Sequence, residues 1–177
     1  MVLLPQFATF AAAVFLLLVY SRGWEMPVFG DKVDVSASGL MRVAYLPAYA
    51  AGFALIALDP RNLLRATLRQ PFLIFLMMVV AGSVLWSIAP DVTTRRAFAV
   101  ICTTLGGLVL ASRFSWAQLA EVVAVTFAIL IVACFAVCLA VPSIGVMTEL
   151  FPGAWRGLWM EKNALGGVMA FGFCILA

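Results

Sequence analysis

Residues 122–141 read VVAVTFAILIVACFAVCLAV, an unbroken run of 20 residues with no charged side chain. A helix of about 20 apolar residues spans the hydrocarbon core of a bilayer, because each residue adds about 1.5 Å along the helix axis. The rest of the chain has the same character, since 66% of its 177 residues are hydrophobic and 11% are charged. A soluble domain has about 45–50% apolar and about 25% charged residues, so we predict a membrane protein.

Apolar segments recur along the chain, and the first five are adequate in length for a membrane span. They cover residues 3–20, 40–58, 72–89, 97–112 and 122–141, and a sixth begins near Ala164. We therefore predict an all-α fold, a polytopic transmembrane helical bundle with about five complete spans and a truncated sixth, in a single transmembrane domain over residues 1–177. Because the sequence stops inside an apolar run, we expect it to be the amino-terminal half of a longer protein.

The absence of histidine limits the chemistry of the chain, because histidine is the commonest general base and metal ligand. Four cysteines fall inside apolar runs without a CxxC pair, and we interpret them as small buried hydrophobic residues: Cys102, Cys134, Cys138 and Cys174. We expect neither a metal nor a cofactor. The net charge is +3, with the basic residues in short segments between apolar runs. This distribution favours a lipid bilayer or a phosphorylated lipid as partner, and not nucleic acid.

Residues 59–71, DPRNLLRATLRQP, form the most basic connection. Asp59 is placed to cap a helix that has Pro60 at its first position, followed by arginines at four-residue spacing: Arg61, Arg65 and Arg69. Such a connection is typical of a cytoplasmic loop that faces lipid headgroups. That orientation leaves more cations on the outer side, so either the orientation is reversed or the outer cations serve a function.

A first cluster of polar residues, WSIAPDVTTRRAF at residues 86–98, stands at a junction between two apolar segments. Asp91 can cap the following helix, which would place Arg95 and Arg96 in the first turn. The helix dipole disfavours cations there, so we expect an anion to compensate them. The alternative is that both side chains extend to ordinary headgroups.

A second cluster lies in PGAWRGLWMEKNALGGVMAFG, residues 152–172. Asn163 can cap the last helix, whose free N–H groups would form an anion site beside Lys162 and Arg156. An arginine that grips a phosphate with two hydrogen bonds and a lysine that supplies a compact charge suit a phosphate or pyrophosphate. Glu161 is expected to pair with one of these cations as a salt bridge in preference to acting as a general base.

Aromatic residues surround the second cluster. Trp155 and Trp159 are four residues apart and suit an interfacial aromatic belt.

The two polar clusters together resemble the O-antigen ligase and polymerase family of bacterial envelope proteins, particularly its exopolysaccharide-polymerase branch. The resemblance covers the chain as the amino-terminal half of that family. The residues that carry it are Trp86, Ser87, Pro90, Thr93 and Arg96 in the first cluster, and Trp155, Arg156, Gly157, Lys162, Asn163, Leu165 and Gly166 in the second.

The resemblance implies a multi-pass, metal-independent glycosyltransferase of the bacterial inner (cytoplasmic) membrane. Its donor would be a glycan linked to undecaprenyl pyrophosphate at the periplasmic face, and its acceptor lipid A core or another glycan. Cations that neutralise the departing pyrophosphate would assist the transfer. The expected pyrophosphate-binding residues are Arg95, Arg96, Arg156, Lys162 and Asn163.

The chain departs from the family in two respects. Glu161 stands where relatives usually have histidine, and the family's second half, with the Arg and His residues thought to be catalytic, lies outside this sequence. No catalytic residue is therefore assigned, and we do not expect the 177-residue chain to be active alone.

Two other classes of function remain open. In one, the chain is a transporter or flippase component whose outer cations bind a lipid-linked or anionic solute without making a bond. The low charge at the helix centres argues against this reading. In the other, the chain is a membrane scaffold without a ligand.

Overall fold

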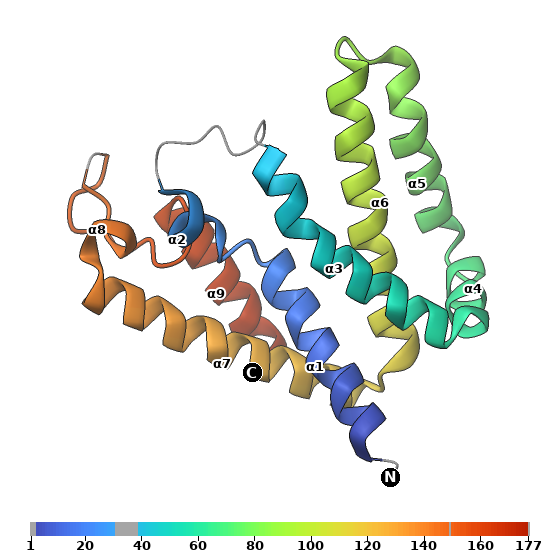
Figure 1. Ribbon diagram of the computed structural model, residues 1–177, viewed down its shortest axis with the longest axis horizontal. Coiled ribbons are helices and arrows are strands. Elements are labelled where there is room, and N and C mark those ends of the chain that lie inside the picture. The colour runs from blue at the N-terminus through green and yellow to red at the C-terminus, as the bar shows by residue number, and fades with distance from the viewer. Residues whose placement is uncertain (1–2, 31–38, 149, 177) are drawn as a thin grey trace. The chain divides into compact units, whose positions relative to one another are not determined.

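The computed structural model describes residues 3–30, 39–148 and 150–176, and helices account for nearly all the regular structure in those ranges (Figure 1). The elements are α1 (Leu3–Tyr20), α2 (Glu25–Phe29), α3 (Gly39–Leu58), α4 (Pro60–Leu68), α5 (Pro71–Gly82), the 3-10 helix η2 (Ser83–Trp86), α6 (Pro90–Arg113), α7 (Trp116–Ala140), α8 (Pro142–Gly145) and α9 (Lys162–Leu176). An isolated antiparallel bridge joins Val146 to Trp155. The prediction of an all-α chain is confirmed.

The chain folds into two compact units. One comprises Met1–Leu46 and Trp116–Ala177, and the other comprises Pro47–Ser115. The single transmembrane domain over residues 1–177 stays a prediction.

The first unit is organised around α7, which packs against α1, α8 and α9. Its core contains Leu130 and Cys134 of α7 together with Leu158 and Trp159, which precede α9. The apolar run at residues 122–141, which predicted a membrane span, thus also packs against the other helices of this unit.

The second unit consists of the carboxyl-terminal part of α3 together with α4, α5, η2 and α6. Both α4 and η2 pack against α5 and α6. Figure 1 shows α5 and α6 running side by side. Tyr49 of α3 meets Phe98 of α6 edge to face, with ring centroids 5.8 Å apart. Aromatic rings in this arrangement attract one another because the positive edge of one faces the negative face of the other.

The count of membrane spans differs from the prediction. In the described residues α6 and α7 are long and apolar enough to cross a membrane, and the pair α3 and α4 passes the same test only when taken together across a 94° bend. Gln6–Tyr20, Pro71–Trp86 and Lys162–Leu176 are shorter apolar helices. The chain is thus a membrane protein with two or three candidate spans, and five complete spans are not supported.

The third predicted segment, residues 72–89, shows why hydropathy overestimated the span count. Its α-helix ends at Gly82, tightens into η2, and stops at Trp86, where Ser87 is extended with ψ 139°. A 3-10 turn of this kind commonly ends a helix. The run remains apolar past the point at which the backbone leaves the helix.

The cysteines are free thiols, and three of them are buried as predicted: Cys102, Cys134 and Cys138. The fourth, Cys174 on α9, is exposed. Their burial agrees with the role of small apolar side chains.

Candidate anion-binding residues

The turn before α6 is built by hydroxyl groups from the first polar cluster. Ser87 Oγ hydrogen bonds to Thr93 Oγ1, and it also accepts a hydrogen bond of 3.1 Å from the backbone N–H of Ala89. The carbonyl of Ala89 accepts from Thr93 N at 3.0 Å. Ser87 and Thr93, six residues apart, therefore close a local hydrogen-bonded turn that sets where α6 begins.

The predicted cap of this helix is wrong. The N-cap is Ala89, without a side-chain hydrogen bond, and Pro90 occupies the first helical position, so Asp91 lies inside the first turn. Proline favours the first helical position because its fixed φ suits a helix and its missing N–H has no partner there in any case. Arg95 consequently lies in the second turn, and the unfavourable effect of the dipole on it is weaker than we expected.

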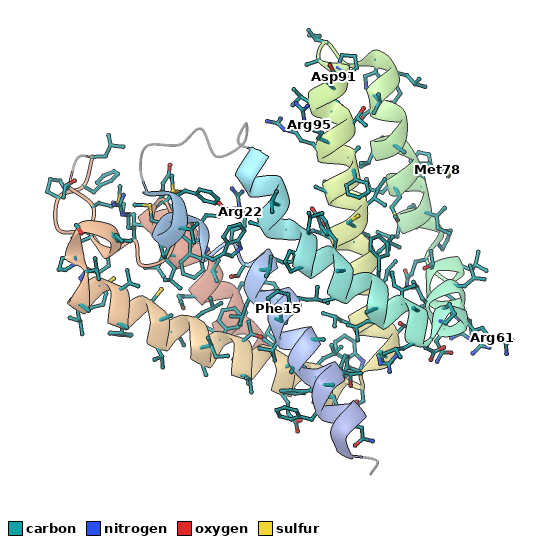
Figure 2. The ribbon with its side chains drawn as sticks, in the orientation of Figure 1. Phe15, Arg22, Arg61, Met78, Asp91 and Arg95 are labelled. Atoms are coloured by element: carbon teal, nitrogen blue, oxygen red, sulfur yellow. The ribbon has the colours of Figure 1, made fainter. Side chains whose placement is uncertain are left out.

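Arg95 and Arg96 are both exposed on α6. In the part of the chain that the structure describes, neither guanidinium makes a hydrogen bond or ion pair with another residue. Figure 2 shows Arg95 and Asp91 projecting from the same end of α6. Both arginines are accessible to an anion from outside the protein.

Arg156 occupies a different environment, since only 5% of its surface is exposed. Its Nε donates to the carbonyl of Ile144 at 2.7 Å, and Nη2 donates to the carbonyl of Ser143 at 3.3 Å. Charge-assisted bonds of this kind are stronger than neutral ones. The guanidinium therefore holds α8 against the segment that leads to α9, and its direct contact with a ligand anion remains a prediction.

The backbone around Arg156 is packed tightly onto α7. The N–H groups of Arg156 and Gly157 both donate to the carbonyl of Gly145, at 2.9 and 3.0 Å. A Cβ at Gly145 would lie 2.6 Å from Cys138 Cα, and Gly157 has φ +61° with Cys134 Sγ equally close to a Cβ there. Glycine is needed at Gly145 because a Cβ would meet the backbone of α7, and at Gly157 because its positive φ strains any residue with a Cβ.

The two tryptophans of the second cluster have separate roles. Trp159 is 5% exposed, and its Nε1–H donates to the carbonyl of Ser21 at 2.7 Å. Trp155 is 42% exposed and meets Phe135 edge to face, with centroids 5.4 Å apart. A buried indole with a satisfied N–H is part of the core, so Trp159 does not belong to the interfacial belt that we predicted.

The amino end of α9 carries the remaining site residues. The helix begins at Lys162, and the carbonyl of Glu161 accepts from Leu165 N at 3.3 Å, so Asn163 is the second helical residue and the predicted Asn163 cap is wrong. Lys162 Nζ lies 3.3 Å from the centroid of the Phe151 ring. Glu161 is exposed, and no ion pair joins it to Lys162 within the described residues. The cation–π contact holds the ammonium near the end of the helix.

An ion pair between an exposed arginine and a buried glutamate, which the sequence did not lead us to expect, follows α1. Arg22, at a left-handed φ of 61°, donates to both carboxylate oxygens of Glu25 at 2.7 and 2.8 Å. Glu25 is buried, and Tyr45 Oη donates to it at 3.3 Å. The hydrogen bond to Glu25 raises the pKa of Arg22 above its usual value. The signal in the sequence was the spacing of opposite charges around Gly23 in SRGWE, residues 21–25.

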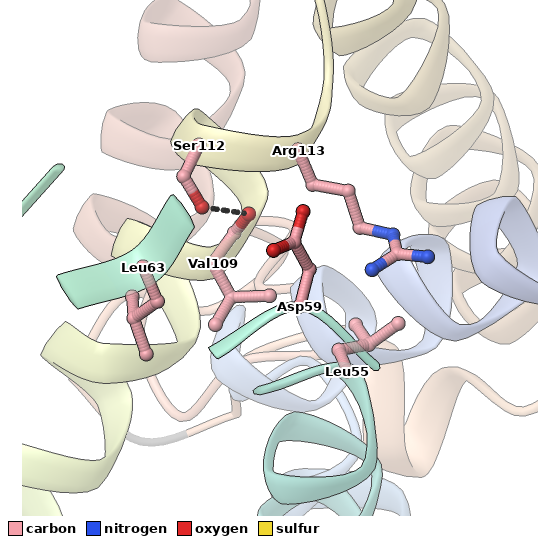
Figure 3. Close-up of a pocket in the computed structure, with 6 residues that line it drawn as sticks. All are labelled: Leu55, Asp59, Leu63, Val109, Ser112 and Arg113. Carbon is pink, nitrogen blue, oxygen red and sulfur yellow. Dashed lines mark hydrogen bonds between the residues drawn. The ribbon is translucent and has the colours of Figure 1, made fainter. Parts of the chain in front are cut away.

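A small pocket in the second unit lies where α3 turns into α4 (Figure 3). Its volume is about 10 Å³, enough for about one water molecule. It is lined by Leu55, Asp59, Leu63, Val109, Ser112 and Arg113. The pocket is too small for a sugar or a pyrophosphate.

The predicted anion-binding residues divide between the two units. Arg95 and Arg96 belong to the second unit, whereas Arg156, Lys162 and Asn163 belong to the first.

The described residues contain no group of three or more His, Cys, Asp or Glu side chains that could hold a metal ion. We find no match of the chain to a protein-family model, a curated protein or a solved structure.

Proposed function

We propose that the chain belongs to a bacterial inner-membrane enzyme that transfers a glycan from undecaprenyl pyrophosphate to lipid A core or to another glycan at the periplasmic face. The observation that carries the proposal is the exposure of Arg95 and Arg96, without protein partners in the described structure, beside the Ser87–Thr93 turn of the resembling motif. Exposed cations that have no internal partner can bind an anion without first breaking an ion pair.

The chemistry of the donor explains why such cations would be useful. Transfer of the glycan breaks the bond between the sugar and the pyrophosphate, and negative charge develops on the leaving oxygen. Arginine can donate two parallel hydrogen bonds to phosphate oxygens, which stabilises that charge. Lys162 and Asn163 are proposed to bind a pyrophosphate at the amino end of α9, while Arg156 is proposed to hold the segment before Lys162 in place.

The proposal is tested with Arg96→Gln in the protein as its gene encodes it, expressed in cells that make the glycan. Arg113→Gln is the matched control, because Arg113 lies at the opposite end of α6. We expect Arg96→Gln to lower the release of undecaprenyl pyrophosphate in isolated membranes by about 10²-fold, as for loss of one charge-stabilising group. Equal release from the two variants at equal membrane content would overturn the role of Arg96.

A second candidate is a transporter or flippase component, which the break between α3 and α4 favours. Broken helices often line substrate paths in transporters, and these two helices meet at 94°. In this case the lipid-linked glycan would cross the membrane with no release of undecaprenyl pyrophosphate. Measuring translocation and release in the same vesicles separates the two candidates.

A further inference from the structure

The break between α3 and α4 fixes an abrupt change of direction. Asp59 leaves the helical conformation, with φ −153° and ψ 69°, and its Oδ1 accepts from Asn62 N at 3.3 Å. Pro60 takes the first position of α4 and α4 departs at 94° from α3. If α3 runs along the membrane normal, α4 therefore lies close to the plane of the membrane.

The side chains of α4 comprise a buried leucine, a pair of exposed leucines and an exposed basic stripe. Leu63 is buried and lines the pocket of Figure 3. Leu64 and Leu68 are 61% and 65% exposed, and because they are four residues apart they share one face. The basic stripe is exposed and consists of Arg61, Arg65 and Arg69.

The basic stripe has little to hold it within the protein. Arg65 donates to Asn62 Oδ1 at 3.2 Å, while Arg61 and Arg69 have no hydrogen bond or ion pair through their side chains in the described residues. Figure 2 shows Arg61 pointing away from the neighbouring helices. Two leucines and three arginines are thus left side by side on the outside of one helix.

The helix after α4, α5, carries large apolar side chains on its exposed surface. After Pro71, α5 presents Phe72 and Phe75 to the exterior, with Phe72 88% exposed. Exposed apolar side chains of this size indicate contact with lipid in a chain that crosses a membrane. The polar end of that lipid layer must therefore lie near the junction of α4 and α5.

We propose that α4 is an interfacial helix that binds the anionic headgroups of a phospholipid leaflet. Leu64 and Leu68 insert at the boundary of the acyl chains, and Arg61, Arg65 and Arg69 contact the phosphates. Helices with an apolar stripe beside a basic one bind membranes in this way. An arginine near an anionic leaflet contributes about 1 kcal/mol to this attraction. The proposal does not depend on glycan transfer.

The position of α4 is tested by single cysteines carrying nitroxide labels, at Leu64, Leu68 and Asn62 in turn, in a background without the four native cysteines. The whole chain is placed in vesicles of phosphatidylcholine and phosphatidylglycerol. We expect the labels at 64 and 68 to collide more with oxygen than with a water-soluble nickel chelate, and the label at 62 to do the opposite. High chelate accessibility at all three would place α4 in water, and high oxygen accessibility at all three would place it across the membrane. Either result overturns the proposal.

The basic stripe is tested separately by the preference of the protein for labelled phosphatidylglycerol over phosphatidylcholine, measured by energy transfer from its tryptophans. Replacing Arg61, Arg65 and Arg69 together by glutamine is expected to lower the preference, by about fivefold for each arginine in contact. Replacing them together by lysine keeps the charge and should retain most of it. An unchanged preference in the glutamine variant, or an equal loss in both variants, would rule out charge-based binding.

Discussion

Two arginines in similar settings of the sequence occupy opposite environments in the structure. Arg156 is buried and bonded to the carbonyls of Ser143 and Ile144, whereas Arg96 is exposed on α6. Both follow a tryptophan and a proline at the border of an apolar run, and both were predicted to bind a pyrophosphate. Residue type and neighbours in the sequence therefore do not reveal which cation supports the fold and which is open to a ligand.

The difference arises from what each segment packs against. The segment of Arg156 returns onto α7, where Gly145 and Gly157 leave no space between backbone and helix. Arg96 lies on a helix that continues without returning, and the next residue, Ala97, faces the interior. A buried guanidinium must be satisfied by protein atoms, whereas an exposed one is satisfied by water until a ligand replaces it.

The largest effect is expected where the packing against α7 is closest. Gly145→Ala would place a Cβ 2.6 Å from Cys138 Cα, a backbone atom that cannot move aside without displacing α7. We expect a loss of about 3 kcal/mol or more of the free energy of unfolding, at the upper end for overpacked sites. The measurement is denaturation by SDS in mixed micelles.

Gly166→Ala is the control for this substitution, because nothing lies within 4 Å of a Cβ at that position of α9. It should stay within about 0.5 kcal/mol of the parent or gain slightly from helix propensity. Equal stability of the two variants would show that the segment does not press on α7 as described.

The comparison of the two arginines is sharpened by Arg156→Met and Arg96→Met. The first leaves the carbonyls of Ser143 and Ile144 without their guanidinium partner, so we expect a loss of about 2–3 kcal/mol. The second removes only an exposed charge and is expected to stay within about 0.5 kcal/mol. Thermal unfolding in detergent, followed by tryptophan fluorescence, measures both. A larger loss for Arg96→Met would reverse the assignment of structural and accessible arginine.

Hydropathy predicted the helices well because each long apolar run must be helical in a bilayer, where every backbone N–H needs a partner. The run at 122–141 lies within α7 except for Val141, and Asp59 with Pro60 begins α4 as expected. The early end of the helix at Gly82 was not predictable in this way, because Ser83–Trp86 stays apolar while its backbone changes to a 3-10 turn.

The site residues were harder to predict because their environment depends on contacts between distant parts of the chain. Trp159 meets Ser21 across 138 residues, and no local pattern carries that information. The error at Asp91 was avoidable, since the rule that put Pro60 first in its helix applies equally to Pro90. Arg22 and Glu25 are three residues apart in the sequence, but the burial of Glu25 is a tertiary property.

The two tryptophans offer a smaller test of the same contrast. Trp159→Phe keeps an aromatic ring in the core but removes the donor to the Ser21 carbonyl, for which we expect a loss of about 1–2 kcal/mol. Trp155→Phe should cost less, since its ring edge on Phe135 is kept and its residue is partly exposed. Unfolding in mixed micelles provides the measurement, and the reverse order would contradict the assignment of Trp159 to the core.

The smallest effect is expected at the turn that begins α6. Ser87 and Thr93 hydrogen bond to each other, and Ser87 also accepts from Ala89 N. We expect Ser87→Ala and Thr93→Val each to lower the free energy of unfolding by about 1 kcal/mol. The double variant should lose less than the sum, because either change already removes the shared bond. Strict additivity in this cycle would show that the two hydroxyls act independently. In that case the spacing of the motif would have to be explained by something other than the turn that presents Arg95 and Arg96.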